Sequence, residues 1–373
     1  MRLNRERKTV NWKYVLVYLA ALVFAVFVVY RTAHHDYYNA ITITGATPLA
    51  VTQKVPPEFS LVVDGMVKKT YTLSSSALRA FATTRIRTKE VSVQGEFEGT
   101  YIYVGIPVFN ILEGVAPAFR EDSFMDTPTD FLITFSSDSG KKVCFSYGEL
   151  LMTDDEAPVT LAFYRQELLP SKDPEKYTIN IRKQGLHGFR LIAPRERDTA
   201  RYLDHVERIT LSVPTVHSDL LPERRKNIDC AASDITALLG DKVFMTGFDG
   251  VENVRVDEWI RVGHGKGYKG TASVEGYSLR SFLKLNFPGC GFDNYFLFIS
   301  CDGYRCLFSG REIFGTCDGE DMILIKNMDG KEPAGGNMLA CIDDYFIDRS
   351  IWGVTHVVVL TPEELQTSLM DTM

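Results

Sequence analysis

The sequence predicts a mostly β body of the α+β class, built from two related domains and preceded by one membrane-spanning helix. Three observations predict it: an uncharged apolar run near the start, short β-rich runs separated by turn residues, and a long internal repeat. The chain has 373 residues, of which 45% are apolar and 24% charged, so it is long enough for two domains of about 150 residues each.

The first predicted element is the apolar segment near the N-terminus. Val15 to Tyr30 carries no charge, and residues 14–32 are long enough to cross a bilayer as a helix. Residues 1–13 hold an excess of Arg and Lys, which marks a cytoplasmic tail. The run ends in Tyr30 and Arg31 rather than in a small-x-small cleavage site, which favours an anchor over a cleaved signal peptide. We expect a single-pass cell-membrane protein that contacts lipid through residues 14–32, with its body extracytoplasmic.

The body follows a tether. Residues 33–56 lack a helical period and end beside Pro57, which is typical of a linker. Two β-rich runs around Asp64-Gly65 predict a hairpin with a two-residue turn, and a short helix is expected at Ser75 to Phe81. Residues 362–373 are expected to form a C-terminal tail.

A repeat with a spacing of about 165 residues indicates two related domains rather than stacked small units. Three pairs of stretches define it: a strand and helix entry from Phe97 and from Tyr268, a hairpin from Leu132 and from Leu297, and a closing strand ending at Leu211 and at Leu360. These pairs place the two domains at residues 57–212 and 215–361.

Six motifs of the first domain occur in the order of a known family. They are Val63-Asp64-Gly65, Val91-Ser92-Val93-Gln94-Gly95, Gly105-Ile106-Pro107-Val108, Ser137-Asp138-Ser139-Gly140, Gly188 to Pro194 (GFRLIAP) and Arg201-Tyr202-Leu203. In this order they resemble the molybdopterin-binding oxidoreductase domain of the sulfite oxidase type, which is a mixed, mostly β fold. The resemblance covers the first domain, and residues 215–361 look like a divergent second copy.

The sequence departs from the family at the position of the metal ligand. In catalytic members of the family, the cysteine of a V-C-V-x-G strand gives its thiolate to molybdenum, whereas Ser92 stands at that place here. A hydroxyl is a harder and far less acidic ligand than a thiolate. We therefore assign no catalytic residue and no metal ligand, although serine ligation in another molybdenum family keeps a metal at Ser92 open. The second copy has Gly263-His264-Gly265 at this place and offers no thiolate.

The resemblance also implies candidate cofactor contacts. Arg190 and Arg201 stand where the family holds the pterin phosphate, a role suited to charge-assisted hydrogen bonds. Tyr101 and Tyr103 are candidates to line the pterin groove. The alternative for both arginines is an ion pair with nearby acids. The corresponding positions of the second copy are Met338 and Ser350.

Several functions lack their usual signatures. The net charge of -7 argues against a nucleic-acid partner, because phosphate binding needs a basic face. No C-x-x-C-H, H-E-x-x-H or G-x-S-x-G motif is present. Arg7-Lys8 is not the twin-arginine pair that usually exports enzymes folded around this cofactor. Unfolded insertion would leave the cofactor behind.

The cysteines are concentrated in the second domain. Of seven, only Cys144 lies in the first domain, and the odd total leaves at least one thiol unpaired. The other six could form up to three disulfides in an oxidising compartment, in a pattern that the sequence does not fix.

The sequence thus favours a non-catalytic binding or assembly module without a cofactor, whose partner is another membrane or extracytoplasmic protein. The alternative is a molybdopterin-dependent oxidoreductase that passes electrons to a membrane or periplasmic redox partner, with Ser92 facing the metal. A purely structural surface protein is a third possibility.

Overall fold

A computed structural model describes residues 54–365, except 57, 119–127, 154–156, 170–180, 215, 217–220, 224–229, 231–233, 264–266 and 362–363. The predicted tail, membrane segment and most of the tether, residues 1–53, lie outside the described part, as do residues 366–373. Within the described residues, no helix is both long enough and apolar enough to span a membrane.

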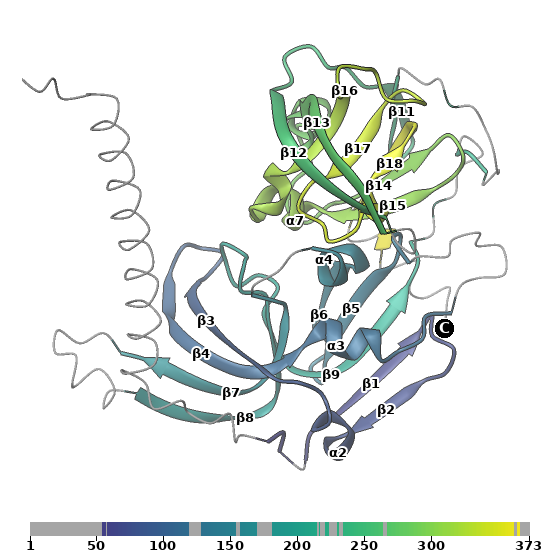
Figure 1. The fold of residues 1–373 in the computed structure, drawn as a ribbon. Helices are drawn as coiled ribbons and strands as arrows, with labels where there is room; N and C mark the ends of the chain where they lie inside the picture. The colour runs from purple at the N-terminus through teal and green to yellow at the C-terminus, as the bar shows by residue number, and fades with distance from the viewer. Residues whose placement is uncertain are drawn as a thin grey trace, which may run out of the picture. The chain divides into compact units, whose positions relative to one another are not determined.

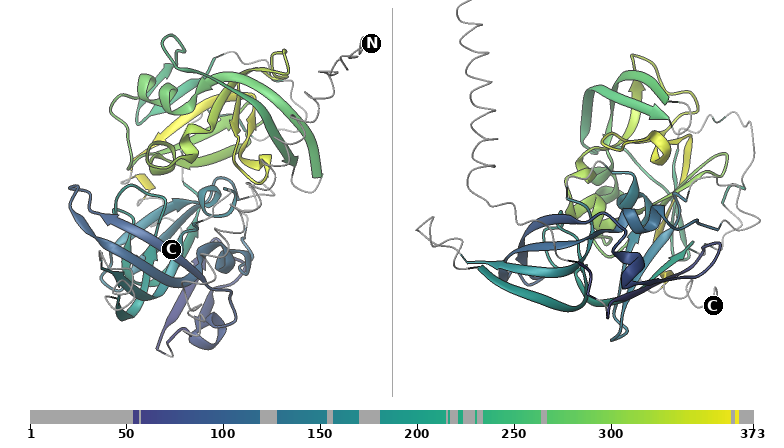
Figure 2. Two further views of the ribbon diagram at one scale, coloured as in Figure 1. Left: turned by 60° about the vertical axis from the view of Figure 1, so that its left-hand side comes forward. Right: turned by 60° about the horizontal axis from the view of Figure 1, so that its bottom comes forward.

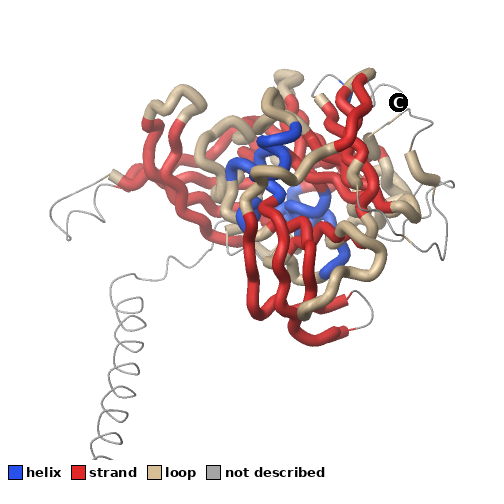
Figure 3. Tube along the Cα trace, turned by 90° about the horizontal axis from the view of Figure 1, so that it is seen from above, coloured by secondary structure: helices blue, strands red, loops and turns tan. Residues whose placement is uncertain are grey.

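Strands dominate the described residues and the helices are short, as predicted for a mostly β protein (Figure 3). We call residues 58–214 the first half. Its strands are β1 Ser60–Gly65, β2 Tyr71–Ser74, β3 Thr84–Val91, β4 Phe97–Pro107, β5 Leu132–Ser137, β6 Lys142–Ser146, β7 Thr160–Leu168, β8 Ile181–Ile192 and β9 Leu203–Ser212. Its helices are α2 Ser75–Leu78, α3 Val108–Glu113 and α4 Tyr147–Leu151.

We call residues 230–365 the second half. Its strands are β10 Thr236–Leu239, β11 Lys242–Met245, β12 Asn253–Gly263, β13 Gly267–Ser278, β14 Tyr295–Ser300, β15 Arg305–Ser309, β16 Met322–Met328, β17 Met338–Cys341, β18 Ile351–Trp352 and β19 Val354–Leu360. Its helices are α6 Leu279–Asn286 and α7 Gly310–Gly315, with 3-10 turns η1 Asp318–Glu320 and η2 Ile347–Arg349.

One set of strands has the same pairing in both halves. In the first, β1 is antiparallel to β2 and parallel to β9, which pairs with the β5–β6 hairpin. In the second, β10 is antiparallel to β11 and parallel to β19, which pairs with the β14–β15 hairpin. The parallel contact joins strands far apart in sequence, so this agreement is not a consequence of simple hairpins.

The remaining strands also correspond. They follow the order β3-β4-β7-β8 in the first half and β12-β13-β16-β17 in the second, and both begin with a long hairpin (Figures 1 and 2). In the first half β9 joins the two sets into one nine-stranded sheet. In the second, Gly353 with a φ of 65° separates β18 from β19, and the sets are two five-stranded sheets. A left-handed backbone of this kind suits glycine.

Each half has its own apolar core. One large cluster of buried residues consists of first-half residues together with Val55, and another consists of second-half residues. The predicted Asp64-Gly65 hairpin forms, but its loop is Met66 to Thr70 rather than two residues. Contacts with distant residues stabilise this longer loop: Met66 N donates to Leu211 O at 2.7 Å, and Lys68 N donates to Ala116 O at 3.0 Å.

Candidate functional site

Three of the candidate residues lie around one buried carboxylate of β3. Glu90 is 2% exposed. Its Oε1 accepts hydrogen bonds from the Tyr103 hydroxyl at 2.7 Å and the Thr88 hydroxyl at 3.0 Å, and its Oε2 pairs with Arg190 at 3.3 Å. The Tyr101 ring lies 5.9 Å from the Tyr103 ring. Arg190, Tyr101 and Tyr103 are therefore neighbours, and the group that they surround is an acid.

A second carboxylate completes the surroundings of Arg190. Its guanidinium donates to both oxygens of Asp204, at 2.8 and 2.9 Å. Burial would lower the pKa of Arg190, but Tyr103, Asp204 and Glu90 together hold that pKa above its ordinary value. Burial raises the pKa of the Tyr103 hydroxyl well above its usual range, so this phenol remains a neutral donor to Glu90.

Ser92 lies in the turn between β3 and β4, not within a strand. Its backbone N donates to Glu96 O at 2.8 Å, and its Oγ accepts a hydrogen bond from Glu96 N at 3.2 Å. Val93 within this turn and Phe97 at the start of β4 are 62% and 68% exposed. The hydroxyl therefore stabilises the turn, as serine hydroxyls commonly do. In the second half the equivalent turn includes residues 264–266, which lie outside the described part.

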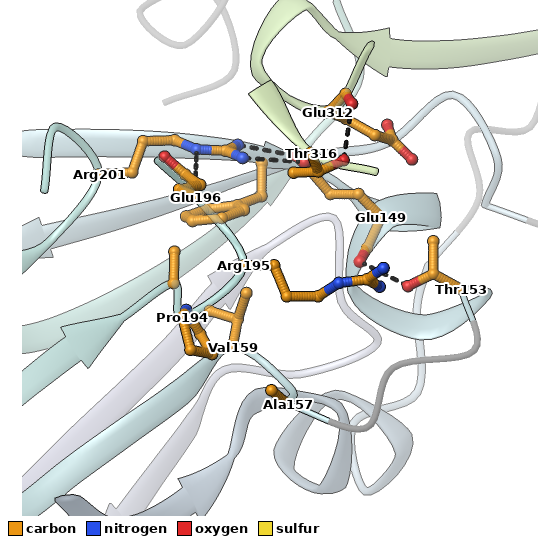
Figure 4. Close-up of a pocket in the computed structure, with 12 residues that line it drawn as sticks. Glu149, Thr153, Ala157, Val159, Pro194, Arg195, Glu196, Arg201, Glu312 and Thr316 are labelled. Carbon is orange, nitrogen blue, oxygen red and sulfur yellow. Dashed lines mark hydrogen bonds and ion pairs between the residues drawn. The ribbon is translucent and has the colours of Figure 1, made fainter. Parts of the chain in front are cut away.

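Arg201 belongs to a different site, between the two halves. It is 6% exposed and its guanidinium lies 3.8 Å from the centre of the Phe145 ring. It donates to both oxygens of Glu149, at 2.9 and 3.0 Å, and to Glu196 at 2.6 Å. Figure 4 shows Arg201 beside Glu196, and Glu312 on α7 of the second half lies nearby. The predicted alternative, pairing with nearby acids, describes both arginines, although Arg201 is buried rather than on the surface.

The halves meet through the N-terminal ends of two equivalent helices. Ser146 caps α4 in a capping box with Glu149, and Ser309 caps α7 by accepting from Glu312 N. The two capping serines also form hydrogen bonds between the halves. Ser309 Oγ donates to Glu149 Oε2 at 2.9 Å, and Ser146 Oγ donates to Glu312 Oε2 at 3.5 Å. The two S-x-x-E spacings are a signal in the sequence that could have located this interface.

The second half has its own buried arginine. Arg349 is fully buried and forms ion pairs with Glu312 and with Asp344, the latter at 2.6 Å. Burial raises the pKa of Glu312 to about 8, with Arg349 opposing the shift and the neighbouring charge of Glu149 adding to it. Sequence reasoning missed Arg349, because the arginine stands one residue before Ser350, the position that aligns with Arg201.

Two cavities adjoin Arg201. One of about 30 Å³ lies among Glu149, Glu196 and Glu312, with room for water-sized occupants. The other, of about 280 Å³, is lined by residues that include Lys142, Cys144 and Arg311. Arg311 pairs with Asp198 at 3.0 Å. No group of three or more His, Cys, Asp or Glu side chains in the described part is placed to hold a metal ion.

The cysteines form one disulfide among the described residues, between Cys230 and Cys301, whose Cα atoms are 6.0 Å apart. Cys306 and Cys341 are buried free thiols, and Cys317 is an exposed one. Burial raises the pKa of both Cys306 and Cys341, so neither is a ready nucleophile or metal ligand.

Comparison with known proteins identifies no family for this chain. No family model matches the chain, and no curated protein matches it. Among solved structures, the sulfane dehydrogenase SoxCD from Paracoccus pantotrophus is similar over 80% of this chain and 78% of that chain, with 14% sequence identity and a TM-score of 0.30. A superposition with this score does not establish a shared fold or activity.

Proposed function

We propose that this protein is a membrane-anchored, extracytoplasmic binding or assembly module, built from two tandem sulfite-oxidase-like domains that do not perform molybdenum chemistry. One observation carries the proposal: both arginines that would hold the cofactor are already neutralised by carboxylates of the protein.

The surroundings of both arginines do not fit the phosphate of a pterin cofactor. Arg190 lies between Glu90 and Asp204, and every one of its carboxylate contacts is 3.3 Å or shorter. Arg201 is held in the same way by two acids in the junction between the halves. The charge of each guanidinium is already matched by carboxylates of the protein, so a phosphate would have to displace these acids or add negative charge without a balancing cation, which costs free energy. The Ser92 hydroxyl, engaged in a turn, adds no metal ligand.

The strand order supports the tandem arrangement. The two halves share a parallel closing contact and two antiparallel hairpins, in the same order along the chain. A duplicated domain explains this agreement with one event, whereas two unrelated folds would need it by chance. We therefore propose domain limits at 57–212 and 215–361.

The location rests on the sequence of residues 1–32 and on the disulfide. Structural disulfides persist in oxidising compartments, so Cys230–Cys301 favours an extracytoplasmic body. Exposed Cys317 offers a direct test. A membrane-impermeant maleimide applied to intact cells is expected to label the wild type and to label a Cys317→Ser variant much less. Labelling only after lysis would contradict the proposed topology.

The loss of molybdenum chemistry is tested with the full chain and its Ser92→Cys variant, both made in a host that synthesises the molybdenum cofactor. Molybdenum per chain is measured by mass spectrometry. We expect none in either protein, because restoring the thiolate leaves both arginines paired with acids. Stoichiometric metal in the variant would show that the pocket is otherwise intact, and this result would refute the argument from charge.

A further inference from the structure

Three positions are equivalent in the two halves by strand pairing, and the residues at these positions differ in character. Ile106 of β4 pairs with Leu161, and Tyr277 of β13 pairs with Leu324. Two residues further along each partner strand, a bulge interrupts the ladder. The bulged residue is Phe163 in the first half and Lys326 in the second.

The third position lies on the next strand. Arg190 pairs with Ala162 in the first half, and Met338 pairs with Ile325 in the second. The residue just before each is Phe189 in the first half and Asn337 in the second. Three apolar residues of the first half thus correspond to a tyrosine, a lysine and an asparagine.

In the first half these three side chains fill the core. Ile106, Phe163 and Phe189 are 0%, 2% and 1% exposed. The Phe189 ring packs edge-on against Phe59, with centroids 4.9 Å apart. No space for a ligand is expected among side chains packed in this way.

In the second half the same three positions line a pocket of about 180 Å³. One wall is aromatic: it consists of Phe248 and Tyr277, whose ring centroids are 4.8 Å apart at a shallow angle. The buried ring of Phe282 packs against Phe248 at 5.2 Å. Lys326 and Glu332 stand at the rim, and Asn337 completes the lining. The pocket is smaller than the typical site for a drug-sized ligand and matches a ligand of about one ring.

Four polar side chains line this pocket and make no hydrogen bond or ion pair through their polar groups within the described part of the chain. The Asn337 side-chain nitrogen is buried and makes no hydrogen bond there. Among the described residues, the Tyr277 hydroxyl makes no hydrogen bond, and neither Lys326 nor Glu332 forms an ion pair. A buried amide without a partner costs about 1 to 3 kcal/mol, so a native protein normally supplies one.

A wider groove continues from the pocket. Its cavity of about 680 Å³ shares Lys326 and Glu332 with the pocket and runs along β12 and β13, past Asn327. The Asn327 side-chain oxygen is likewise buried without a partner in the described residues. A ligand longer than one ring would therefore find further polar groups in line with the pocket.

We infer that this pocket binds a neutral sugar ring, with further sugar units extending along the groove. The rim carries one cation and one anion, which favours a ligand without net charge. Asn337 and Lys326 donate hydrogen bonds, Glu332 accepts them, and Tyr277 does either, which suits adjacent hydroxyls. The apolar face of a pyranose packs on the aromatic wall. The inference concerns a second-half site and stands whether or not the first half has lost its cofactor.

The test is calorimetric titration of the full-length, detergent-solubilised protein with neutral hexoses, N-acetylhexosamines and their linear oligomers. One site per chain is expected, with oligomers binding more tightly than monomers. Tyr277→Phe and Asn337→Ala should each weaken binding by about three- to tenfold, because each removes one hydrogen bond. Asn337→Phe, which restores the first-half residue, should abolish binding.

A matched control is Lys284→Ala, which removes an exposed lysine of α6 outside the pocket, compared with Lys326→Ala. Only the Lys326 variant should bind more weakly. Failure of every neutral sugar to bind would overturn the inference, as would equal binding by wild type and Asn337→Phe, or binding confined to charged ligands. Metal content does not enter this experiment, so its failure is distinct from failure of the proposed function.

Discussion

The two halves of this protein share a strand order but use equivalent positions in opposite ways. In the first half, Phe163 and Phe189 close the core, while in the second Lys326 and Asn337 open a pocket at the same point of the ladder. The first half pairs Arg190 with acids. The same strand order therefore supports a closed apolar core in one half and polar groups without partners in the other. Function depends on such sites rather than on the fold itself.

The largest expected effect separates the two equivalent positions directly. Phe189→Ala should lower the free energy of unfolding by about 3 to 5 kcal/mol, because it leaves a cavity in a closed core. Asn337→Ala should leave the free energy of unfolding unchanged or raise it, because it removes an amide nitrogen that is buried without a partner in the described residues. Denaturant unfolding of both variants measures the difference. Equal losses would mean that the two positions are not packed differently.

The buried ion pairs give a second comparison. Arg349→Ala should cost about 3 to 5 kcal/mol, because the Asp344 carboxylate would remain buried without its cation. Arg255, whose side chain is 60% exposed, forms ion pairs of similar geometry with Asp257 and Glu275. Its replacement by alanine should leave the unfolding midpoint in urea unchanged. A large shift for Arg255→Ala would show that exposure does not decide the effect.

The disulfide joins two residues of the second half. Replacing Cys230 and Cys301 by serine should lower the free energy of unfolding by about 2 to 4 kcal/mol, since the bond closes a loop between residues 71 apart. Reducing the wild type should produce the same loss, and the reductant should not affect the double variant. An unchanged wild type under reduction would show that the bond does not form.

The sequence predicted most strands but little of the sites. Hairpins such as β5–β6 and β14–β15 follow from local patterns of apolar and turn residues, and the repeat placed them in both halves. The partner of Arg201 could not be read in this way, because Glu149 meets it only once distant strands have paired. The sequence analysis missed the pocket at Asn337 for the same reason. An asparagine just before a strand is expected to be exposed to solvent, and only the folded structure shows that its amide nitrogen is buried.

A smaller effect concerns pH at the junction between the halves. Burial raises the pKa of Glu312 from its ordinary 4.5 to about 8, so the folded protein keeps a proton that the unfolded chain has lost. The free energy of unfolding should therefore fall as pH rises from about 4.5 to 8. Glu312→Gln should reduce that slope, with the remainder due to Glu196, whose pKa burial also raises. A slope that Glu312→Gln leaves unchanged would place the raised pKa elsewhere.

The central claim is that the framework is used for binding and not for molybdenum chemistry. The most direct measurement is the content of molybdenum, tungsten and oxidised pterin in protein purified from its native source. The paired arginines predict that none of the three is present in proportion to the chain. One metal ion and one pterin per chain would contradict the account and make Ser92 the ligand to examine.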